Sequence, residues 1–553
     1  MHASTRTAII LAAGSPPASL EMVFGRTSSA MVPVNGRPVI HWLIHHLKEI
    51  GVSRVVMGVK AGETRLVRFV RQAFGSILEL DFVFMESDRG PGFTLLKCLE
   101  RLPPSSSCLV VLGDTLFEFP PGFAPPDSES YVLLHPVQDA ARWCLAGLDD
   151  HGRVLRLADK PETNPENWPA LIGVYHFASI DAAREALGEQ FQNTTESLQI
   201  RHALAPYIRA GQLHGIPAGQ WYDCGNLDFL TSSRRRMLQV RNFNSIQIDE
   251  LRGTITKRSS HAGKFLNEIN YYRLLPPDLA TFFPRLVDFS LAREDMYLTL
   301  EYYGYPTLSE LWVFEEMDAT HWEAIFTLLA RVLECFERYG ADLSPTETYR
   351  FYWQKTLDRI QEFARQSPRF ARLAQAEKLT LNDADIEGWP AIRDEVERRV
   401  REMAARPAGR IIHGDLCFPN MLYDRVSRLF KFIDPRGSFA EAGILGDARY
   451  DIAKLMHSLD GGYDFIIHNM FALQEEETRI QLQVFYPGHR KGFLAAFEKV
   501  FSPRFALAEA RLIEGLLFLS MCALHSDHPD RQTAMWVTGL RILHQVIHHE
   551  NMH

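Results

Sequence analysis

Short apolar runs alternate with amphipathic stretches along the first part of the chain. The runs rich in β-branched and other apolar residues, which we predict to be strands, are 7–13, 54–59, 81–84 and 108–112. The stretches between them with apolar residues at helical spacing are 38–47, 63–74 and 92–101. Strands that alternate with helices in this way predict an α/β fold with a parallel sheet.

A different pattern follows a polar stretch near residue 240, where we place the boundary between domains 1–240 and 241–553. Residues 245–312 predict a small, mostly β lobe, and residues 313–553 predict a helical lobe. The small lobe is expected to contain strands at 253–259 and 298–303 and a helix at 264–275. The helical lobe shows helical periodicity at 322–339 and 391–405.

Composition narrows the class of protein. The 553 residues carry a net charge of −9, which argues against a protein built to hold nucleic acid. The seven cysteines include no C-x-x-C pair, which favours free thiols in a cytoplasmic protein. The longest apolar stretch near the end, residues 516–524, is shorter than the roughly 20 residues of a membrane-spanning helix, so no membrane segment is expected.

The chemistry of the second domain is concentrated in the run His413-Gly414-Asp415, then Asn420, then Ile433-Asp434. Phosphoryl transfer needs a carboxylate that takes the proton of the attacking hydroxyl. It also needs an amide and a second carboxylate that hold Mg²⁺ on the nucleotide phosphates. A buried histidine beside a surface Asp-Asn turn is the alternative explanation of so short a motif.

This run resembles the catalytic signature of the aminoglycoside phosphotransferase and choline kinase family, and residues 446–453 resemble that family's next helix start. The resemblance implies a bilobal α+β fold like that of protein kinases and the phosphorylation of a small-molecule alcohol by ATP. It implies that Asp415 is the catalytic base and that Asn420 and Asp434 bind Mg²⁺.

The same resemblance assigns residues of the small lobe to ATP. By order and spacing, Lys257 is expected to contact the nucleotide phosphates, and Glu268 is expected to fix that lysine. Residues 298–303, which include Glu301, resemble the last strand and the hinge whose backbone reads adenine. The sequence lacks a full glycine-rich phosphate loop in this lobe.

In the first domain, Gly14 and Asp114 each follow a predicted buried strand. Ligands of parallel α/β sheets bind at the carboxyl ends of the strands. Asp114 is therefore a candidate Mg²⁺ ligand, with a helix-capping or turn aspartate as the alternative.

Six segments of this domain resemble, in order, the motifs of sugar-1-phosphate nucleotidylyltransferases and of the related cytidylyltransferases: 11–14, 31–40, 112–114, 158–161, 173–177 and 221–226. The resemblance covers about residues 5–240 and implies a Rossmann-like fold. It implies that Leu11, Ala13 and Gly14 approach the nucleotide. It further places Gly90 and Gly92 at the base.

The resemblance also implies that Asp114 and Asp223 bind Mg²⁺ and that Lys160 neutralises the phosphorylated substrate. One departure is notable, because Ser29 stands where the family has a lysine. Arg26 is expected to supply the missing cation, since its guanidinium is permanently charged and binds phosphate in a bidentate manner. The departure leaves open a domain that binds a nucleotide without turning it over.

Together these features predict a bifunctional transferase with Mg²⁺ as cofactor and ATP and a second NTP, CTP slightly favoured, as substrates. It would phosphorylate an alcohol, polyol or sugar and activate the product for surface polysaccharide synthesis. The alternatives are a kinase with a nucleotide-binding regulatory domain and a non-catalytic scaffold. Assembly into a homo-oligomer is left open.

Other residues have no assigned role. Trp312, Trp353 and Tyr463 fit either an acceptor pocket or the core. His544 and His548 lie four residues apart, but no H-E-x-x-H motif joins them, so we describe them as part of a histidine-rich tail.

Overall fold

The computed structural model describes residues 6–25, 27–123, 126–164, 167–193, 196–239, 246–315, 317–488 and 490–548. The chain divides into two compact units, Met1–Arg236 and Met237–His553. Each unit is described by itself.

The first unit is built on a large mixed sheet. The strands of this unit are β1 (Arg6–Ala12), β2 (Pro33–Val34), β3 (Arg37–Pro38), β4 (Val52–Lys60), β5 (Glu79–Met85), β6 (Cys108–Leu112), β7 (Thr115–Glu118), β8 (Ser130–His135), β9 (Cys144–Leu148), β10 (Val154–Asp159), β11 (Ala170–Phe177), β12 (Leu213–Pro217) and β13 (Gln220–Asp223). The main sheet has the order β10-β9-β11-β6-β1-β4-β5, with β8 paired to β11 and β12 paired to β8, whereas β2 pairs with β3 and β7 with β13 in two separate small sheets. Strands β6, β1, β4 and β5 are parallel to one another, as the pattern of apolar runs predicts.

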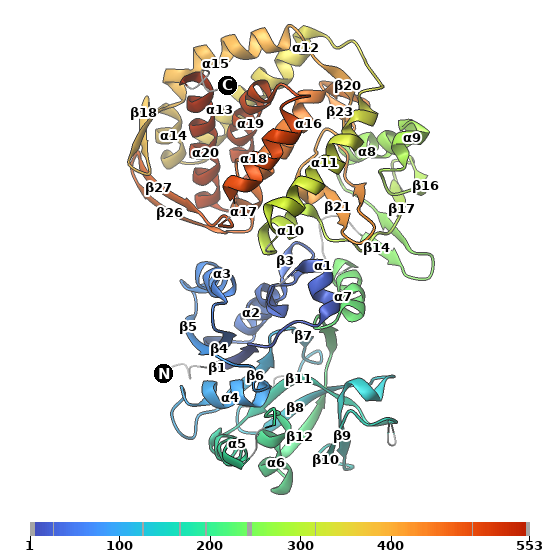
Figure 1. The fold of residues 1–553 in the computed structure, drawn as a ribbon, viewed down its shortest axis with the longest axis vertical. Helices are drawn as coiled ribbons and strands as arrows, with labels where there is room; N and C mark the ends of the chain where they lie inside the picture. The colour runs from blue at the N-terminus through green and yellow to red at the C-terminus, as the bar shows by residue number, and fades with distance from the viewer. Residues whose placement is uncertain are drawn as a thin grey trace. The chain divides into compact units, whose positions relative to one another are not determined.

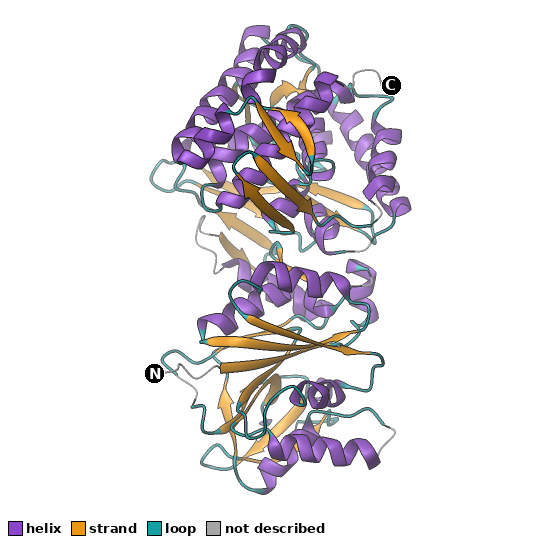
Figure 2. Ribbon diagram, turned by 90° about the vertical axis from the view of Figure 1, so that its left-hand side faces the viewer, coloured by secondary structure: helices purple, strands orange, loops and turns teal. Residues whose placement is uncertain are grey.

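Helices cover both faces of this sheet (Figures 1 and 2). They are α1 (Ala18–Phe24), α2 (Val39–Glu49), α3 (Thr64–Phe74), α4 (Pro91–Leu99), α5 (Asp181–Asn193), α6 (Arg201–Arg209) and α7 (Leu227–Gln239). In Figure 1, α2 and α3 lie on one face and α4, α5 and α6 lie on the other. Because both faces are covered, the central strands are buried along their length, which explains their continuous apolar runs.

The second unit begins with a small lobe whose sheet has the order β14-β15-β17-β16. Its elements are β14 (Ile246–Asp249), β15 (Thr254–Lys257), α8 (Ala262–Leu274), α9 (Pro277–Ala280), β16 (Leu286–Ser290) and β17 (Tyr297–Glu301). The buried face of α8 carries Phe265, Glu268, Ile269, Tyr271 and Tyr272. The mixed α/β character of the first unit and the small sheet-containing lobe of the second unit agree with the predicted fold class.

The larger lobe is mainly helical. Its helices are α10 (Leu308–Phe314), α11 (Ala319–Phe336), α12 (Pro345–Tyr349), α13 (Lys355–Gln366), α14 (Pro368–Gln375), α15 (Trp389–Ala404), α16 (Ala448–Leu459), α17 (Tyr463–Ile467), α18 (Arg490–Phe501), α19 (Leu507–Met521) and α20 (Pro529–His548). Helix α19 packs against α13, α16 and α20, and these helices form its core (Figure 1). One π-helical turn, Arg350–Gln354, joins α12 to α13.

Short strands carry the loops that matter for chemistry. They are β20 (Gly409–Ile411), β21 (Met421–Asp424), β22 (Leu429–Phe432), β23 (Ser438–Phe439), β24 (Glu441–Ala442) and β25 (Leu445–Asp447). Strands β21 and β22 form an antiparallel hairpin that places Met421 opposite Phe432.

The sequence analysis missed one sheet of this lobe. Strands β18 (Lys378–Leu381), β19 (Ala384–Glu387), β26 (Phe471–Glu476) and β27 (Arg479–Val484) pair in the order β19-β18-β27-β26. They form two hairpins, which are joined by a short parallel pairing between β18 and β27 and by hydrogen bonds of Asn382 and Asp383 with β27. A pairing across such a separation leaves no local sequence signal, so the predicted helical lobe did not include this sheet.

Two expectations about the whole chain can be compared with the described residues. All seven cysteines are free. Within the described ranges, no helix has the length and apolar character that crossing a membrane requires.

The core of the larger lobe generates a stability prediction. Trp536 on α20 is fully buried and stacks on Phe363 of α13, with the ring centroids 4.9 Å apart. Replacing a buried tryptophan by alanine leaves a cavity and costs about 3 to 5 kcal/mol. Trp536→Ala should lower the denaturant midpoint of the second unit, whereas Leu251→Ala, at a side chain that is 97% exposed, should leave it unchanged. Equal midpoints for both variants would contradict the packing described.

Candidate functional site

The first candidate site lies where parallel strands β1 and β6 end. The backbone N–H of Gly113 donates to the carbonyl oxygen of Leu11 at 2.9 Å, so the two loops that follow these strands are adjacent. Leu11 and Ala13 are buried, and the space around the Cα of Gly14 is open. The structure therefore places Gly14 at an accessible strand end, which is where α/β sheets bind nucleotides.

Asp114 and Asp223 come together at this edge. Strand β7 pairs with β13 so that Thr115 lies opposite Asp223, and the N–H of Cys224 donates to the carbonyl oxygen of Asp114 at 2.9 Å. A Cβ atom built on Gly225 would lie 2.5 Å from Asp114 Oδ2 and 3.3 Å from Asp223 Oδ1. Both carboxylates thus converge on one glycine, and any side chain at position 225 would intrude on them.

The electrostatics of this pair fit a divalent cation. Burial, together with the nearby Asp114, raises the pKa of Asp223 to about 7, although the N–H of Gly225 and Arg142 oppose the shift. Burial also raises the pKa of Asp114. Two buried carboxylates with raised pKa values would be stabilised by a cation between them, and Mg²⁺ binds to one or two carboxylates beside phosphate oxygens. The donor set therefore fits Mg²⁺.

Local packing explains why positions 90 and 92 are glycine. A Cβ on Gly90 would lie 2.6 Å from the carbonyl oxygen of Leu198, and Gly90 has a φ of 89°. The N–H of Gly92 donates to the same oxygen at 2.8 Å. These glycines let the start of α4 pack against residues 197–199.

The basic residues expected around the first site are distributed differently. Lys160 follows β10 with an exposed side chain and a φ of 48°, and its N–H donates to the carbonyl oxygen of Trp143. Arg26 lies outside the described residues. Lys60, at the carboxyl end of β4, donates to Ser15 Oγ at 3.4 Å and thereby reaches the loop after β1. Sequence reasoning missed Lys60, although its position at the end of a parallel strand was a usable signal.

The second candidate site is built on the β21–β22 hairpin. Asn420 precedes β21 and Asp434 follows β22, and the N–H of Ile433 donates to the carbonyl oxygen of Asn420 at 3.0 Å. The hairpin thus brings the expected metal ligands side by side. Asp434 adopts a φ of 54°, a sparsely populated conformation that projects its carboxylate away from the strand.

Lys257 connects this hairpin to the small lobe. Its Nζ lies 2.9 Å from Glu268 Oε1 on α8 and 3.0 Å from Asp434 Oδ1. Burial lowers the pKa of Lys257, but the two carboxylates outweigh burial and raise it above its ordinary value. Burial and Asp434 raise the pKa of Glu268 to about 7, although Lys257 opposes them. The structure brings together the lysine and the glutamate that the sequence analysis selected.

Asp415 sits on the accessible side of the same loop. Its Oδ1 lies 2.8 Å from Lys454 Nζ, and Asn420 Nδ2 donates to its Oδ2 at 3.1 Å. The Asp415 side chain is 39% exposed, whereas Lys454 is 10% exposed. Burial alone would raise the pKa of Asp415, but Lys454 lowers it below its ordinary value. Asp415 is therefore an accessible carboxylate that stays ionised.

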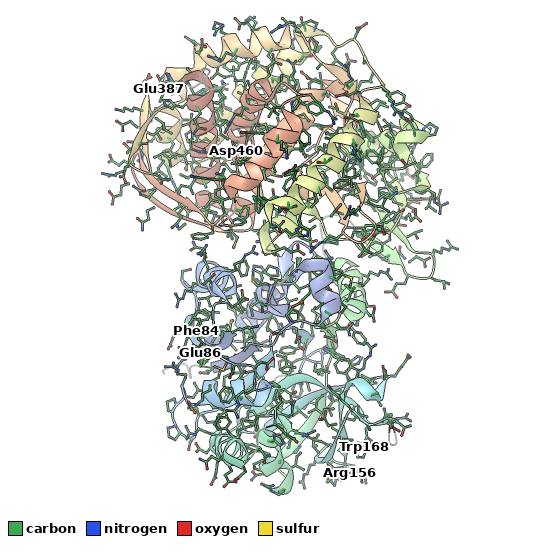
Figure 3. The ribbon with its side chains drawn as sticks, in the orientation of Figure 1. Phe84, Glu86, Arg156, Trp168, Glu387 and Asp460 are labelled. Atoms are coloured by element: carbon green, nitrogen blue, oxygen red, sulfur yellow. The ribbon has the colours of Figure 1, made fainter. Side chains whose placement is uncertain are left out.

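Lys454 was missed by sequence reasoning. It lies on α16 among Ile452, Ala453 and Leu455, all of which are buried, and a lysine inside such a run was a signal of a buried partner. The far end of α16 is fixed by Asp460, labelled in Figure 3, which pairs with Arg490 and Arg511.

The buried ring of His413 fixes this loop by hydrogen bonds to its backbone. Its Nε2 donates to the carbonyl oxygen of Ile433 at 3.0 Å, and its Nδ1 accepts from the N–H of Asp415 at 3.2 Å. Burial lowers its pKa to about 4, so the ring is neutral. Asp451 accepts from the N–H groups of His413 and Gly414 at 2.7 and 2.9 Å. These contacts fix the backbone that presents Asp415.

The remaining candidate residues lie outside the two sites described above. Glu301 ends β17, accepts from the hydroxyl of Tyr303 at 3.0 Å and lies 3.9 Å from Arg285. Trp312 and Trp353 are buried in the core. The ring of Tyr463 contacts that of His457, with the ring centroids 4.3 Å apart and the planes tilted by 31°.

His544 and His548 lie on helix α20, so their description as part of a terminal tail was wrong. Both rings contact Glu387 Oε2 of β19, which is labelled in Figure 3. The three residues are close enough to hold a metal ion, but the contacts are those of a hydrogen-bonded ion pair when a histidine is protonated.

Comparison with known proteins divides the chain in the same way. The model of the MobA-like NTP transferase domain matches residues 8–120. The model of the phosphotransferase enzyme family matches residues 246–478.

Individual relatives match less than half of the chain. The low-salt glycan biosynthesis nucleotidyltransferase Agl11 of Haloferax volcanii is 22% identical over 264 residues, which cover 46% of this chain and 71% of that protein. A glucose-1-phosphate thymidylyltransferase of Streptomyces antibioticus is 27% identical over 246 residues, which cover 42% of this chain and 66% of that protein. The structure of a UDP-glucose pyrophosphorylase complexed with UDP-glucose matches with a TM-score of 0.36 and 18% identity, over 43% of this chain and 100% of that chain.

The chain therefore joins an N-terminal MobA-like NTP transferase domain to a C-terminal domain of the phosphotransferase enzyme family, and it is a transferase enzyme.

Proposed function

We propose that the second unit transfers the γ-phosphoryl group of ATP to a hydroxyl group of a small alcohol, polyol or sugar. The observation that supports this most is the loop that presents an ionised, accessible Asp415 beside Asn420, with Asp434 after the neighbouring strand β22 and Lys257 of the small lobe paired with Asp434. Asp415 takes the proton of the attacking hydroxyl, the oxygen of that hydroxyl bonds to the γ-phosphorus, and ADP leaves.

The other residues of this site hold the nucleotide. Lys257, positioned by Glu268, contacts the phosphates of ATP, and the β17 end at Glu301 lies where the small lobe would read adenine. Asn420 and Asp434 would hold Mg²⁺, which when bound neutralises charge on the phosphates. In the structure Lys257 pairs with Asp434. The phosphates of ATP would therefore compete with Asp434 for Lys257, and the cation would compete with Lys257 for Asp434.

We propose further that the first unit couples the new phosphate to a nucleotide. A phosphate oxygen of the phosphorylated product attacks the α-phosphorus of an NTP, CTP slightly favoured, and pyrophosphate leaves. Asp114 and Asp223 would hold Mg²⁺, which when bound stabilises negative charge on the phosphates. In this proposal Lys160 contacts the phosphorylated substrate, Leu11, Ala13 and Gly14 flank the nucleotide, and Gly90 and Gly92 lie by the base.

The product is an NDP-activated alcohol or sugar. Such a compound serves as a donor in glycan assembly, and the printed name of the Haloferax volcanii relative includes glycan biosynthesis. We propose that this protein works in the cytoplasm in the synthesis of a surface polysaccharide. A panel of alcohols and sugars with ATP and each NTP, with ADP and pyrophosphate followed separately, tests both halves. ADP without pyrophosphate across the panel would refute the second half.

A second candidate function is a kinase whose first unit binds a nucleotide as a regulator. The observation that favours it is Ser29 in place of a lysine, in the short 3₁₀ turn Ser29–Met31. Under this alternative, ADP formation depends on the NTP, and no pyrophosphate is released.

The two proposed sites should be separable by mutation. Asp415→Asn should reduce ADP formation by about 100- to 10,000-fold, the range for loss of a general base, and should spare pyrophosphate release from an already phosphorylated substrate. Asp114→Ala should do the reverse, with a loss of at least about 100-fold. The exposed Asp394→Asn and Asp150→Ala are matched controls. Loss of both activities in each site variant would contradict independent sites.

We expect Lys454 to determine the pH at which kinase activity falls on the acidic side of its pH profile. Because Lys454 lowers the pKa of Asp415, the carboxylate stays ionised as pH falls, and activity is lost only when pH drops through that lowered pKa. Lys454→Met should raise the pKa and move the acidic limb of kcat/KM to higher pH. Lys454→Arg, which keeps the charge, should restore the limb toward its original position. An acidic limb that stays in place in Lys454→Met would show that Asp415 is not the titrating base.

The cation that replaces the missing lysine can be identified by comparison of two variants. Lys60→Met and Arg26→Ala should each be assayed for pyrophosphate release. We expect the variant that removes the compensating cation to lose about 10- to 100-fold in kcat/KM for the NTP, the scale of one charge-assisted contact to phosphate. The exposed Lys48→Met on α2 is the control. Unchanged kinetics in both variants would exclude compensation by either residue.

A further inference from the structure

Basic side chains gather near Asp415 in the second unit. Lys355 Nζ lies 4.0 Å from the centroid of the Phe351 ring, and the guanidinium carbon of Arg436 lies 5.3 Å from the same centroid. Both also approach Tyr450: Lys355 Nζ lies 5.7 Å from its ring centroid, and Arg436 Nη1 donates to its hydroxyl at 3.2 Å. Two cations therefore share one pair of aromatic rings.

This cluster is attached to the catalytic loop. The N–H of Arg436 donates to the carbonyl oxygen of His413 at 3.0 Å, and a Cβ on Gly414 would lie 2.9 Å from the Cβ of Arg436. Lys454 also pairs with Asp415 at 2.8 Å. Three basic side chains, Lys355, Arg436 and Lys454, therefore lie near Asp415.

The positive charge lacks matching carboxylates. Among the residues that the structure describes, no carboxylate oxygen lies within 4.0 Å of Lys355, Arg359 or Arg436. Asp415 is already paired with Lys454, Asp358 accepts from Gln354 at 2.9 Å, and Glu362 is exposed. Burial lowers the pKa of Lys355 well below its ordinary value, and repulsion from Arg436, Lys454 and Arg359 lowers it further. A bound anion would relieve this repulsion.

The local backbone is also unusual. Phe351 lies in the π-helical turn Arg350–Gln354, and Lys355 follows directly as the first residue of α13. Such single π-helical turns occur frequently at functional sites. An open hollow of about 480 Å³ runs beside this turn, lined by Arg350, Gln354, Lys355, Asp358, Arg359 and Glu362. This volume is in the range of sites for small molecules.

We propose that the acceptor of the phosphoryl group is an anionic molecule, a hydroxy acid or sugar acid or a phosphorylated polyol, whose carboxylate or phosphate binds Lys355, Arg359 and Arg436. This inference rests on the proposed kinase function and names the substrate class of that site. The nucleotide phosphates have partners elsewhere, in Lys257 and the Asn420 and Asp434 pair. The cluster lies instead beside Asp415, which faces the acceptor because it takes the acceptor's proton.

Matched pairs of acceptors test the proposal. Glycerol, glucose and ribitol are compared with glycerate, glucuronate and ribitol 5-phosphate, with ADP formation as the readout. We expect kcat/KM to be at least about 10-fold higher for the anionic member of a pair, and the carboxylate and phosphate arms identify which anion is preferred. Equal or better turnover of the neutral members would overturn the proposal while leaving the kinase function intact.

A variant locates the anion site. Lys355→Met should raise KM for the anionic acceptor by about 10- to 100-fold, since a charge-assisted contact is lost, and should leave KM for ATP and turnover of the neutral acceptor unchanged. Lys491→Met, at an exposed lysine of α18, is the matched control and should change neither. A rise in KM for ATP, or an equal loss with both kinds of acceptor, would show that the cluster serves ATP instead.

Calorimetry keeps this test separate from the kinase assay. Glycerate, glucuronate and ribitol 5-phosphate are titrated into the full chain without ATP, and into Lys355→Met. Binding that the variant loses would uphold the anion site even if no acceptor gave ADP, in which case only the proposed kinase function would fail. Absence of binding to the wild-type chain, together with ADP formation from neutral acceptors alone, would refute the anion site.

Discussion

Lys257 is paired at the same time with Glu268 on α8 and with Asp434 on the loop after β22, at 2.9 and 3.0 Å. These two contacts join a strand of the small lobe to the helix that follows it and to the β21–β22 hairpin, which lies 177 residues further along the chain. Because the side chain of Lys257 is mostly buried, removal of either carboxylate would leave uncompensated charge in a poorly solvated place. In the proposed kinase, this arrangement would hold the nucleotide-binding residues together before a nucleotide binds. It also explains why Asp434 holds a strained backbone conformation, since the ion pair and the hairpin fix it from both sides.

The two units differ in how the negative charge of their carboxylates is balanced. In the second unit the two carboxylates that we propose to act in phosphoryl transfer each have a protein cation beside them, Lys257 for Asp434 and Lys454 for Asp415. In the first unit Asp114 and Asp223 face each other across Gly225, and burial raises the pKa of both. A bound divalent cation would stabilise such a pair more than it would stabilise a carboxylate that already has a protein cation beside it. Both arrangements suit chemistry on phosphates, where negative charge must be held close to negative charge until a bond forms.

Sequence reasoning predicted the features of this protein that depend on residues close together in the chain. The apolar runs predicted the parallel strands β1, β4, β5 and β6, and the motif from His413 to Asp434 lies on one hairpin and its flanking loops. It missed the sheet of β18, β19, β26 and β27, because two hairpins far apart in the sequence meet there through a short parallel pairing. It missed Lys454 for a related reason: the lysine is identified as a partner of Asp415 only when α16 packs against the loop. The cluster at Lys355 depends in turn on a π-helical turn, which no residue pattern in the segment predicts.

The central claim is that the phosphate made by one half of the chain becomes a bridging phosphate in the product of the other half. The most direct test is to supply the full chain with ATP labelled in the γ-phosphate, an acceptor and an unlabelled second NTP, and to locate the label. The account predicts label in the β-phosphate of an NDP-linked product, with unlabelled pyrophosphate released from the second NTP. Label that stops in the phosphorylated acceptor while the second NTP stays intact would contradict it.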